Sequence, residues 1–268
     1  MKTLQEEYLE KISSQVFVRA NASDIEQALF MLRWLPQNFD LKNAEVVELV
    51  GDGASNEHIK RVGEKLKKTF EEEILSDGFD LEKMEVQERF PLTFRWLWEH
   101  KFPREAWDFM QEIAFPLPIP KTDVRGYKRP KYIENSRVKV GESCLIPFQF
   151  ERDGFLYLIN DSTEGDKSLF APSRLFAHFP VTKVVANQSL QFPLTEDHFS
   201  LSFEDEGEEF FLAIITKNHL DLSWVHERAD DDLDLNFERL SELFRKVASD
   251  PHPQVFYKKL TIIPPSFF

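Results

Sequence analysis

Short apolar runs alternate with glycine-, proline- and acid-containing turns across residues 138–217. Residues 144–150 alternate strongly apolar and less apolar side chains, which is typical of a strand with one buried face. Residues 155–159 and 210–216 are apolar on both faces and predict central strands that are covered on two sides. Residues 199–203 alternate phenylalanine or leucine with serine, and we expect them to form a hairpin with 210–216. The whole pattern predicts an all-β domain.

The part of the chain before this domain has the three- and four-residue spacing of amphipathic helices. Residues 1–20 predict an opening helix, and Ser23 with Glu26 forms a capping box at the start of the next one. Apolar side chains from Ile59 to Ile74 form one stripe, and Gly78 is expected to end that helix. Residues 41–50 fit either a helix or a buried strand. We therefore predict a helical domain over residues 1–115.

The end of the chain adds one more helix and one more strand. Apolar positions from Leu233 to Val247 step by four and three residues, which predicts an amphipathic helix that packs on the sheet. Residues 255–263 predict a late strand that returns to the sheet. The predicted fold class is α+β, with a helical N-terminal domain followed by a C-terminal antiparallel β-sandwich with one packed helix, over residues 138–268.

Residues 116–137 separate the two predicted domains. Four prolines prevent regular structure there, and basic side chains outnumber acidic ones. The basic residues on which the argument depends are Lys121, Arg125, Lys128, Arg129 and Lys131. We expect a solvated, Pro-rich basic linker. It could also bind an acidic partner or the protein's own acidic surface, or serve as a control or cleavage region, since extended exposed backbone fits a protease cleft.

Aromatic residues are most frequent between Phe90 and Phe115. Trp96 and Trp98 are two positions apart, so on an α-helix they point about 200° away from each other. Either one of them is covered by a second layer of structure, or one is exposed and marks a contact surface. The candidate partner-binding residues are Trp96, Trp98, Phe102 and Trp107. The alternative is that they form an aromatic core between helices.

Composition narrows the function classes. Hydrophobic residues make up 42% of the 268 residues, which is enough for a real core. The net charge of −14 repels a phosphate backbone, so direct nucleic-acid binding is not expected. No apolar segment approaches the ~20 residues that a membrane span needs, and no secretion signal is visible. The single cysteine, Cys144, fits a reducing compartment, so we expect a cytoplasmic protein.

Candidate chemistry is sparse. None of the seven histidines stands in a metal-ligand spacing, so no metal site and no cofactor are predicted. Cys144 could meet His178 or His198 in space, but a thiol inside an apolar strand is a poor nucleophile. The acids lie in turns and at helix starts, where solvation and capping explain them. We therefore predict no catalytic residues and no enzyme activity. The alternative is an enzyme with a dispersed active site that is not visible in sequence.

A resemblance covers about 80 residues of the β-domain. Its elements are Val140-Gly141-Glu142, then Asp153 to Ile159, then Leu169 to Ser173, then Phe192-Pro193, then Phe199-Ser200-Leu201, and finally Gly207 leading into Leu212 to Thr216. In spacing and residue type, this order resembles a bacterial domain family of unknown function that is commonly attached to serine/threonine kinases and caspase-like peptidases. The resemblance implies a small β-sandwich used as an accessory or recognition module, with no catalytic residues to carry over.

These observations lead to one functional hypothesis. We expect a non-enzymatic adaptor or regulatory protein that binds another protein in a bacterial signalling or antiviral defence pathway. Its partner would be a peptidase, a kinase or a transcription factor. The chain would then be a substrate or inhibitor-type partner of a caspase-like peptidase, or would mask a basic DNA-binding surface with its acidic helical domain. The sequence does not indicate an oligomeric state.

Overall fold

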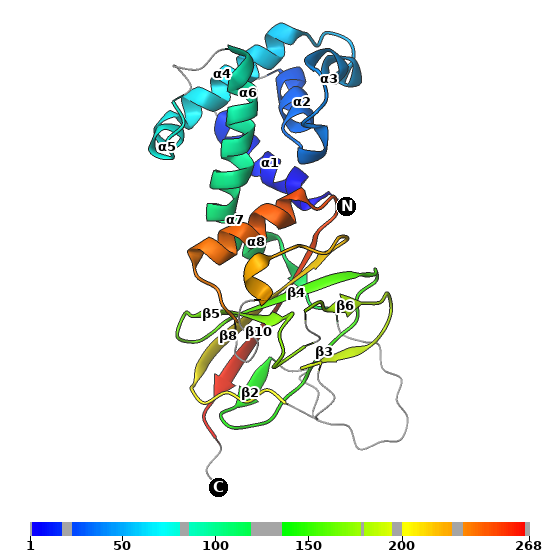
Figure 1. The fold of residues 1–268 in the computed structure, drawn as a ribbon, viewed down its shortest axis with the longest axis vertical. Coiled ribbons are helices and arrows are strands. Elements are labelled where there is room, and N and C mark those ends of the chain that lie inside the picture. Colours follow the sequence, from blue (N-terminus) through cyan, green and yellow to red (C-terminus); the bar gives the residue numbers. More distant parts are fainter. Residues whose placement is uncertain are drawn as a thin grey trace. The chain divides into compact units, whose positions relative to one another are not determined.

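The computed structural model describes residues 2–17, 23–80, 86–118, 136–177, 180–194, 200–226 and 233–265. The chain divides into two compact units, which are described here one at a time (Figure 1). The first unit contains Met1–Trp107 and Phe244–His252, and the second contains Asp108–Leu243 and Pro253–Phe268. The division between the units thus differs from the expected one at residues 116–137.

Helices make up the first unit, which we call the helical unit (Figure 1). The helices in chain order are α1 (Leu4–Val16), α2 (Asp24–Arg33), the 3-10 turn η1 (Pro36–Asn38), α3 (Asn43–Val50), α4 (Asn56–Thr69), α5 (Glu71–Ser76), α6 (Val86–Arg95), the π-helix η2 (Trp96–Lys101) and α7 (Phe102–Ile113), whose second half belongs to the other unit. Within the described residues, none of the helices is long and apolar enough to cross a membrane.

Local signals explain where several of these helices begin and end. The side chain of Ser23 accepts a hydrogen bond from the Glu26 amide, as expected for the start of α2. Gly78, with φ +86°, lies two residues after Ser76, the last residue of α5. The amide of Phe79 then donates to the carbonyl of Ile74, which satisfies a free carbonyl at the helix end. Residues 41–50, which the sequence left open, form α3.

The predicted apolar stripe of residues 59–74 is buried but lies on two helices. Phe70 ends α4 and precedes α5, with φ −116° and ψ 22°, so one long helix becomes two. Ile59 packs in one cluster with Leu29 and Val46, which joins α2, α3 and α4. Partly buried apolar residues around this cluster extend it toward the surface. This burial is the main force that holds the three helices together.

Strands make up most of the second unit, which we call the β-unit (Figure 1). The elements are β1 (Phe115–Pro116), β2 (Arg137–Lys139), β3 (Ile146–Phe148), β4 (Gly154–Asp161), β5 (Lys167–Ala171), β6 (Lys183–Val184), β7 (Leu190–Phe192), β8 (Gly207–Thr216), the 3-10 turn η3 (Ser223–His226), β9 (Leu233–Asp234), the first half of α8 (Phe237–Ser249) and β10 (Gln254–Ile263). The helix α8 was expected to pack on the sheet, but its residues from Phe244 onward group with the helical unit.

Eight strands of the described residues form one mixed sheet. The order along the sheet is β1-β10-β8-β4-β5-β9, with β2 also on β10 and β6 also on β4. The expectation of purely antiparallel strands was wrong, because β1 and β2 both run parallel to β10. Pro116 lies opposite Tyr257, and Arg137 lies opposite Thr261, so the chain reaches the same edge of β10 twice in the same direction.

The central strands β4, β8 and β10 follow the apolar runs of the sequence. β8 is hydrogen-bonded to β4 on one side and to β10 on the other. The predicted hairpin between 199–203 and 210–216 was therefore wrong, since both edges of β8 are already occupied. Leu201 instead forms an isolated bridge with Cys144, and Phe199 lies outside the described residues. The run 169–171 is a strand that ends before Pro172, as expected.

One buried cluster of the β-unit contains residues of the large sheet and of a smaller one. β3 and β7 pair with each other in a separate two-stranded sheet. Their side chains Phe148 and Phe192 belong to one buried cluster with Leu156 of β4 and Phe211 of β8. Cys144, Ile146, Phe148 and Phe150 are buried in this cluster, as expected, but Pro147 between them is buried as well, so the burial of β3 is not one-sided.

Cys144 provides a test of this core. Its side chain is 4% exposed, and burial, with a smaller contribution from the Glu142 carboxylate, raises the pKa of the thiol to about 12. Only the thiolate reacts with disulfide reagents. At pH 8 we expect labelling of the native protein to be slower than labelling in denaturant by about 100-fold or more. A chromogenic disulfide reagent measures both rates, and equal rates would place Cys144 outside the core.

Candidate functional site

The structure buries three of the four aromatic residues that were candidates for partner binding. Trp96, Trp98 and Phe102 are 0%, 5% and 0% exposed, so these three side chains offer no contact surface in this structure. Trp107 is partly exposed. The burial of the first three agrees with the alternative interpretation, an aromatic core between helices.

Different neighbours bury the two tryptophans. Trp96 and Trp98 lie in the segment between α6 and α7 and point to different neighbours. Trp96 packs against Phe70 at 5.4 Å between ring centroids, and Trp98 packs against Phe102 at 5.5 Å. The indole Nε1 of Trp98 donates to the carbonyl of Trp34 at 2.8 Å. The segment is therefore covered on two sides, one of the two arrangements that the sequence left open.

The basic residues of the predicted linker, Lys121, Arg125, Lys128, Arg129 and Lys131, lie outside the described residues, as do His178 and His198. The two ends of the linker are described. The amide of Leu117 donates to the Tyr257 carbonyl at 2.7 Å, and the amide of Thr261 donates to the Ser136 carbonyl at 2.6 Å. Both ends of this segment are therefore held on the same strand, β10.

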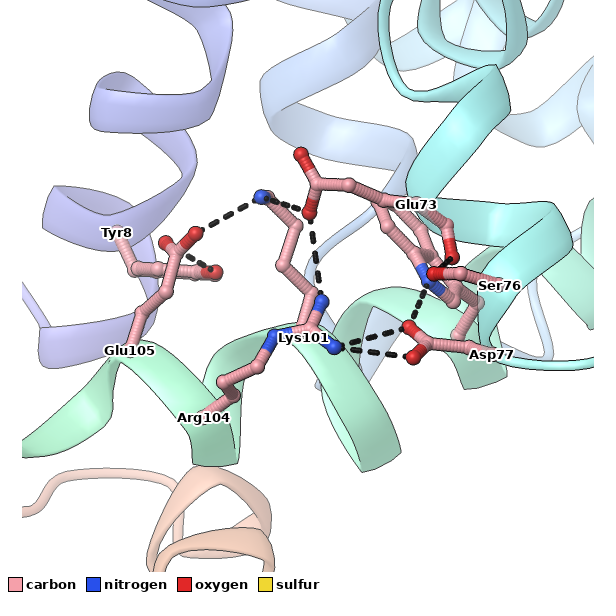
Figure 2. A network of polar contacts seen from close by, with 8 residues as sticks. Tyr8, Glu73, Ser76, Asp77, Lys101, Arg104 and Glu105 are labelled. Carbon is pink, nitrogen blue, oxygen red and sulfur yellow. Dashed lines mark hydrogen bonds and ion pairs between the residues drawn. The ribbon is translucent and has the colours of Figure 1, made fainter.

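The densest group of interacting charges that we describe surrounds Lys101, the last residue of the π-helix. Its side chain is 2% exposed overall, and its Nζ lies 2.8 Å from Glu73 Oε2 and 2.8 Å from Glu105 Oε1. Figure 2 shows Lys101 between these two carboxylates, with Tyr8 on the far side of Glu105. The Lys101 ammonium also lies 4.4 Å from the centroid of the Phe70 ring, in a cation–π contact.

The network continues from Glu73 toward the surface. Arg104 Nη2 lies 3.3 Å from Glu73, and its Nη1 donates to Asp77 at 2.9 Å. Trp96 Nε1 donates to the same carboxylate at 2.8 Å. Burial alone would raise the pKa of Asp77, but the hydrogen bonds from Arg104 and Trp96 outweigh it and lower that pKa. We expect Asp77 to stay ionised down to low pH.

Tyr8 closes the network on the other side. Its hydroxyl donates to Glu105 Oε2 at 3.1 Å. Burial and the neighbouring Glu105 carboxylate raise the pKa of Tyr8 well above its ordinary value, so the phenol stays protonated and remains a donor. The charges of Lys101 and Arg104 are thus met by carboxylates on α5 and α7. This arrangement links α1, α5, the π-helix and α7.

A second feature of the helical unit is a cluster of three phenylalanines at its surface. Phe39, Phe90 and Phe94 have ring centroids 4.7 to 6.1 Å apart. Phe39 is 37% exposed, and the other two rings are partly exposed. Together they form what we call the aromatic surface cluster. Exposed aromatic side chains that touch one another are typical of contact surfaces.

The buried Arg33 side chain contacts two residues of this cluster. Its guanidinium carbon lies 3.4 Å from the centroid of the Phe90 ring, and its side chain is 6% exposed. Its Nη1 donates to the carbonyls of Asn38 and Phe39, and its Nε donates to Asn43 Oδ1. Burial lowers the pKa of Arg33 to about 10. These contacts fix the backbone that carries Phe39, so the exposed ring is held in place rather than loosely attached.

Sequence analysis missed the aromatic surface cluster and the charge network. Phe90 and Phe94 are four residues apart, which places them on one helix face, but nothing links them in sequence to Phe39. Glu73, Lys101 and Glu105 also come from segments almost thirty residues apart. Only Lys101 and Glu105 have the i, i+4 spacing that would have indicated a pair. Among the residues that the structure describes, no group of three or more His, Cys, Asp or Glu side chains is placed to hold a metal ion.

Comparison with known families concerns the β-unit. Residues 137–219 match a family described as a domain of unknown function (DUF4384). The match confirms the expected resemblance of residues 138–217 to a β-domain family of unknown function. The DUF4384 match runs from β2 past the end of β8, so the helical unit and β10 lie outside it. Because β10 pairs with β8 along most of its length, the matched segment does not contain the whole sheet.

Two further comparisons concern whole proteins. No curated protein matches the chain. A search of solved structures found the Pseudomonas fluorescens alkylpurine DNA glycosylase AlkC bound to DNA containing an abasic site analog, at 12% identity and a TM-score of 0.19. The match covers 78% of this chain and 60% of the AlkC chain, so it spans less than two thirds of that protein. A TM-score this low does not indicate a shared fold.

Proposed function

We propose that this protein is a non-enzymatic adaptor or regulatory protein that binds another protein through its helical unit. The aromatic surface cluster is the observation that carries the proposal. Phe39 is exposed, touches Phe94, and is held in place by the buried Arg33 contacts to its backbone. A preorganised aromatic side chain loses little conformational entropy on binding, which makes it a good anchor for a protein partner. Trp107, which is partly exposed, remains a second candidate contact.

The setting of the proposal is a bacterial signalling or antiviral defence pathway in the cytoplasm. Families resembling the β-domain occur beside serine/threonine kinases and caspase-like peptidases, so a peptidase or a kinase is one class of partner. The net charge of −14 suits a partner with a basic surface, such as a transcription factor. The basic segment with Lys121 and Arg129 would be the point of control or cleavage.

The β-unit would serve as an accessory module in this proposal. The shared core of Phe148, Phe192 and Phe211 supports a small β-sandwich built from the large sheet and the sheet of β3 and β7. A module of this kind contributes recognition or placement rather than chemistry. An enzyme with a dispersed site is the alternative, and the charge network around Lys101 is the place where such a site would be sought. Its carboxylates are already engaged by Lys101 and Arg104, which argues for a structural role.

Capture from the native host tests the adaptor proposal. We expect the wild-type protein to carry a protein partner at near-equal amounts, and Phe39→Ala to lower its recovery by about tenfold or more, because anchor residues of an interface contribute about 2 kcal/mol or more. Leu75→Ala is the control, since Leu75 is 52% exposed on the same unit. Mass spectrometry identifies and quantifies the partner.

Two results would count against the proposal. The first is a wild-type protein that is recovered alone, without a partner at comparable amounts. The second is a partner recovered equally with wild type, Phe39→Ala and Leu75→Ala, which would place the contact outside the aromatic surface cluster. Circular dichroism of each variant confirms that both substitutions leave the fold intact.

A further inference from the structure

The segment between Leu117 and Ser136 has an unexpected position in the chain. A linker between two domains would have one domain on each side. Here the residues before it form β1 and the residues after it form β2, and both strands pair with β10. Strand β1 faces Phe256 and Tyr257, and β2 begins opposite Thr261, so the two ends lie only a few residues apart along one edge.

The last residues before this segment, from Asp108 onward, are built into the β-unit. Leu117 is buried in the core cluster of that unit and is hydrogen-bonded through its amide to Tyr257. The next residue, Pro118, accepts a hydrogen bond from the amide of Gln149 at 2.9 Å. Thus the N-terminal piece of the chain supplies the second half of α7, a strand and a core side chain to a unit that is mostly made from the C-terminal piece.

One stretch of the chain after the segment is likewise built into the helical unit. Residues Phe244–His252 group with Met1–Trp107. The side chains of Phe244 and Val247 are buried, and Gln5 of α1 donates through Nε2 to the carbonyl of Ala248 at 2.9 Å. Each unit therefore contains chain from both sides of the segment.

We propose that the two pieces of the chain on either side of residues 119–135 are interlocked and stay together as a non-covalent complex when the backbone between them is cut. Separating them would expose Leu117 in the β-unit and Phe244 and Val247 in the helical unit at the same time. It would also break the pairing of β1 with β10. The apolar burial in both units opposes this separation, and both contacts must be lost together.

This inference changes what cleavage could do, and that consequence rests on the proposed function. If a peptidase controls the protein in its basic segment, the cut does not release the helical unit from the β-unit. It leaves β1 and β2, which pair with successive stretches of β10, on two separate pieces of the chain. Control would then act on the edge of the sheet and on the cut ends, while the aromatic surface cluster stays attached to the β-unit.

An engineered cut in the full-length protein tests the inference. The recognition sequence of a site-specific protease replaces residues 123–129 in one variant and 126–132 in a second, so that one unsuitable insertion does not decide the result. After complete digestion, both pieces should elute together in size-exclusion chromatography at the volume of the uncut protein, and a denaturing gel should show two bands. Two separate native peaks, in either folded variant at micromolar concentration, would overturn the inference.

A matched variant shows whether the association uses the contacts named above. In the cut protein, Leu117→Asp should promote release of the N-terminal piece on dilution, whereas Val185→Asp, at an exposed position of the same unit, should not. Partner capture is measured separately on the cut protein. Pieces that co-elute without any partner would contradict the proposed function alone, and pieces that separate would contradict this inference alone.

Discussion

Replacing Lys101 with methionine should lower the free energy of unfolding of the helical unit by about 3 kcal/mol. The substitution keeps most of the length of the side chain, and it removes the ammonium that lies 2.8 Å from both Glu73 and Glu105. Deleting one partner of a buried ion pair leaves the other charge without compensation, which is costly in a poorly solvated site. Glu73 is partly exposed and can recover hydration, so we expect the lower end of the usual range.

Urea unfolding followed by tryptophan fluorescence measures this change, because Trp34, Trp96, Trp98 and Trp107 all lie in the helical unit. Lys60→Met is the matched control. Lys60 pairs with Glu57 at 2.7 Å, but both side chains are well exposed, and such pairs contribute about 0.2–1 kcal/mol. If the two substitutions have the same effect, the network around Lys101 does not hold the helices together as described.

Replacing Phe211 with alanine should destabilise the β-unit by about 3–5 kcal/mol. Phe211 is fully buried on β8, and its ring centroid lies 5.9 Å from that of Phe170 on β5. The smaller side chain loses the transfer free energy of the ring and leaves a cavity that the rigid sheet cannot close. The effect should be confined to the β-unit, because the Phe211 cluster contains residues of that unit only.

The rate of Cys144 labelling reports this change, since the only cysteine of the chain lies in the same core. When labelling requires opening of the unit, 3 kcal/mol corresponds to a rate increase of about 100-fold. Phe237→Ala is the control, because Phe237 is 69% exposed at the start of α8. We expect its labelling rate to stay close to that of the wild type. A Phe211→Ala protein that labels at the wild-type rate would contradict the described core.

Local sequence signals predicted those elements whose stability depends on neighbouring residues. The Ser23 cap, the Gly78 helix end and the strand that stops at Pro172 all follow from contacts within a few positions. The apolar runs of β4 and β8 were visible because strands buried on both faces need apolar side chains at almost every position. Because such patterns are local, the α+β class and the helical first half were also predicted correctly.

Contacts between distant segments could not be predicted from the sequence. The parallel pairing of β1 and β2 with β10 depends on where the chain leaves and re-enters the sheet, and two-residue strands carry no periodic pattern. Residues 199–203 were wrongly assigned as the hairpin partner of β8, because an alternating pattern predicts a strand but not the strand with which it pairs. The burial of both Trp96 and Trp98 depends on distant residues, Phe70 and Trp34, that cover the two indoles from different sides.

Site-specific photocrosslinking in the native host tests most directly whether this protein works by binding another protein. A photoreactive phenylalanine analogue replaces Phe39 in the aromatic surface cluster, and the same analogue replaces Phe237 as a control. We predict one discrete adduct, of a single additional protein, from position 39 and none of the same mass from position 237. No adduct from position 39, or the same adduct from both positions, would contradict the account.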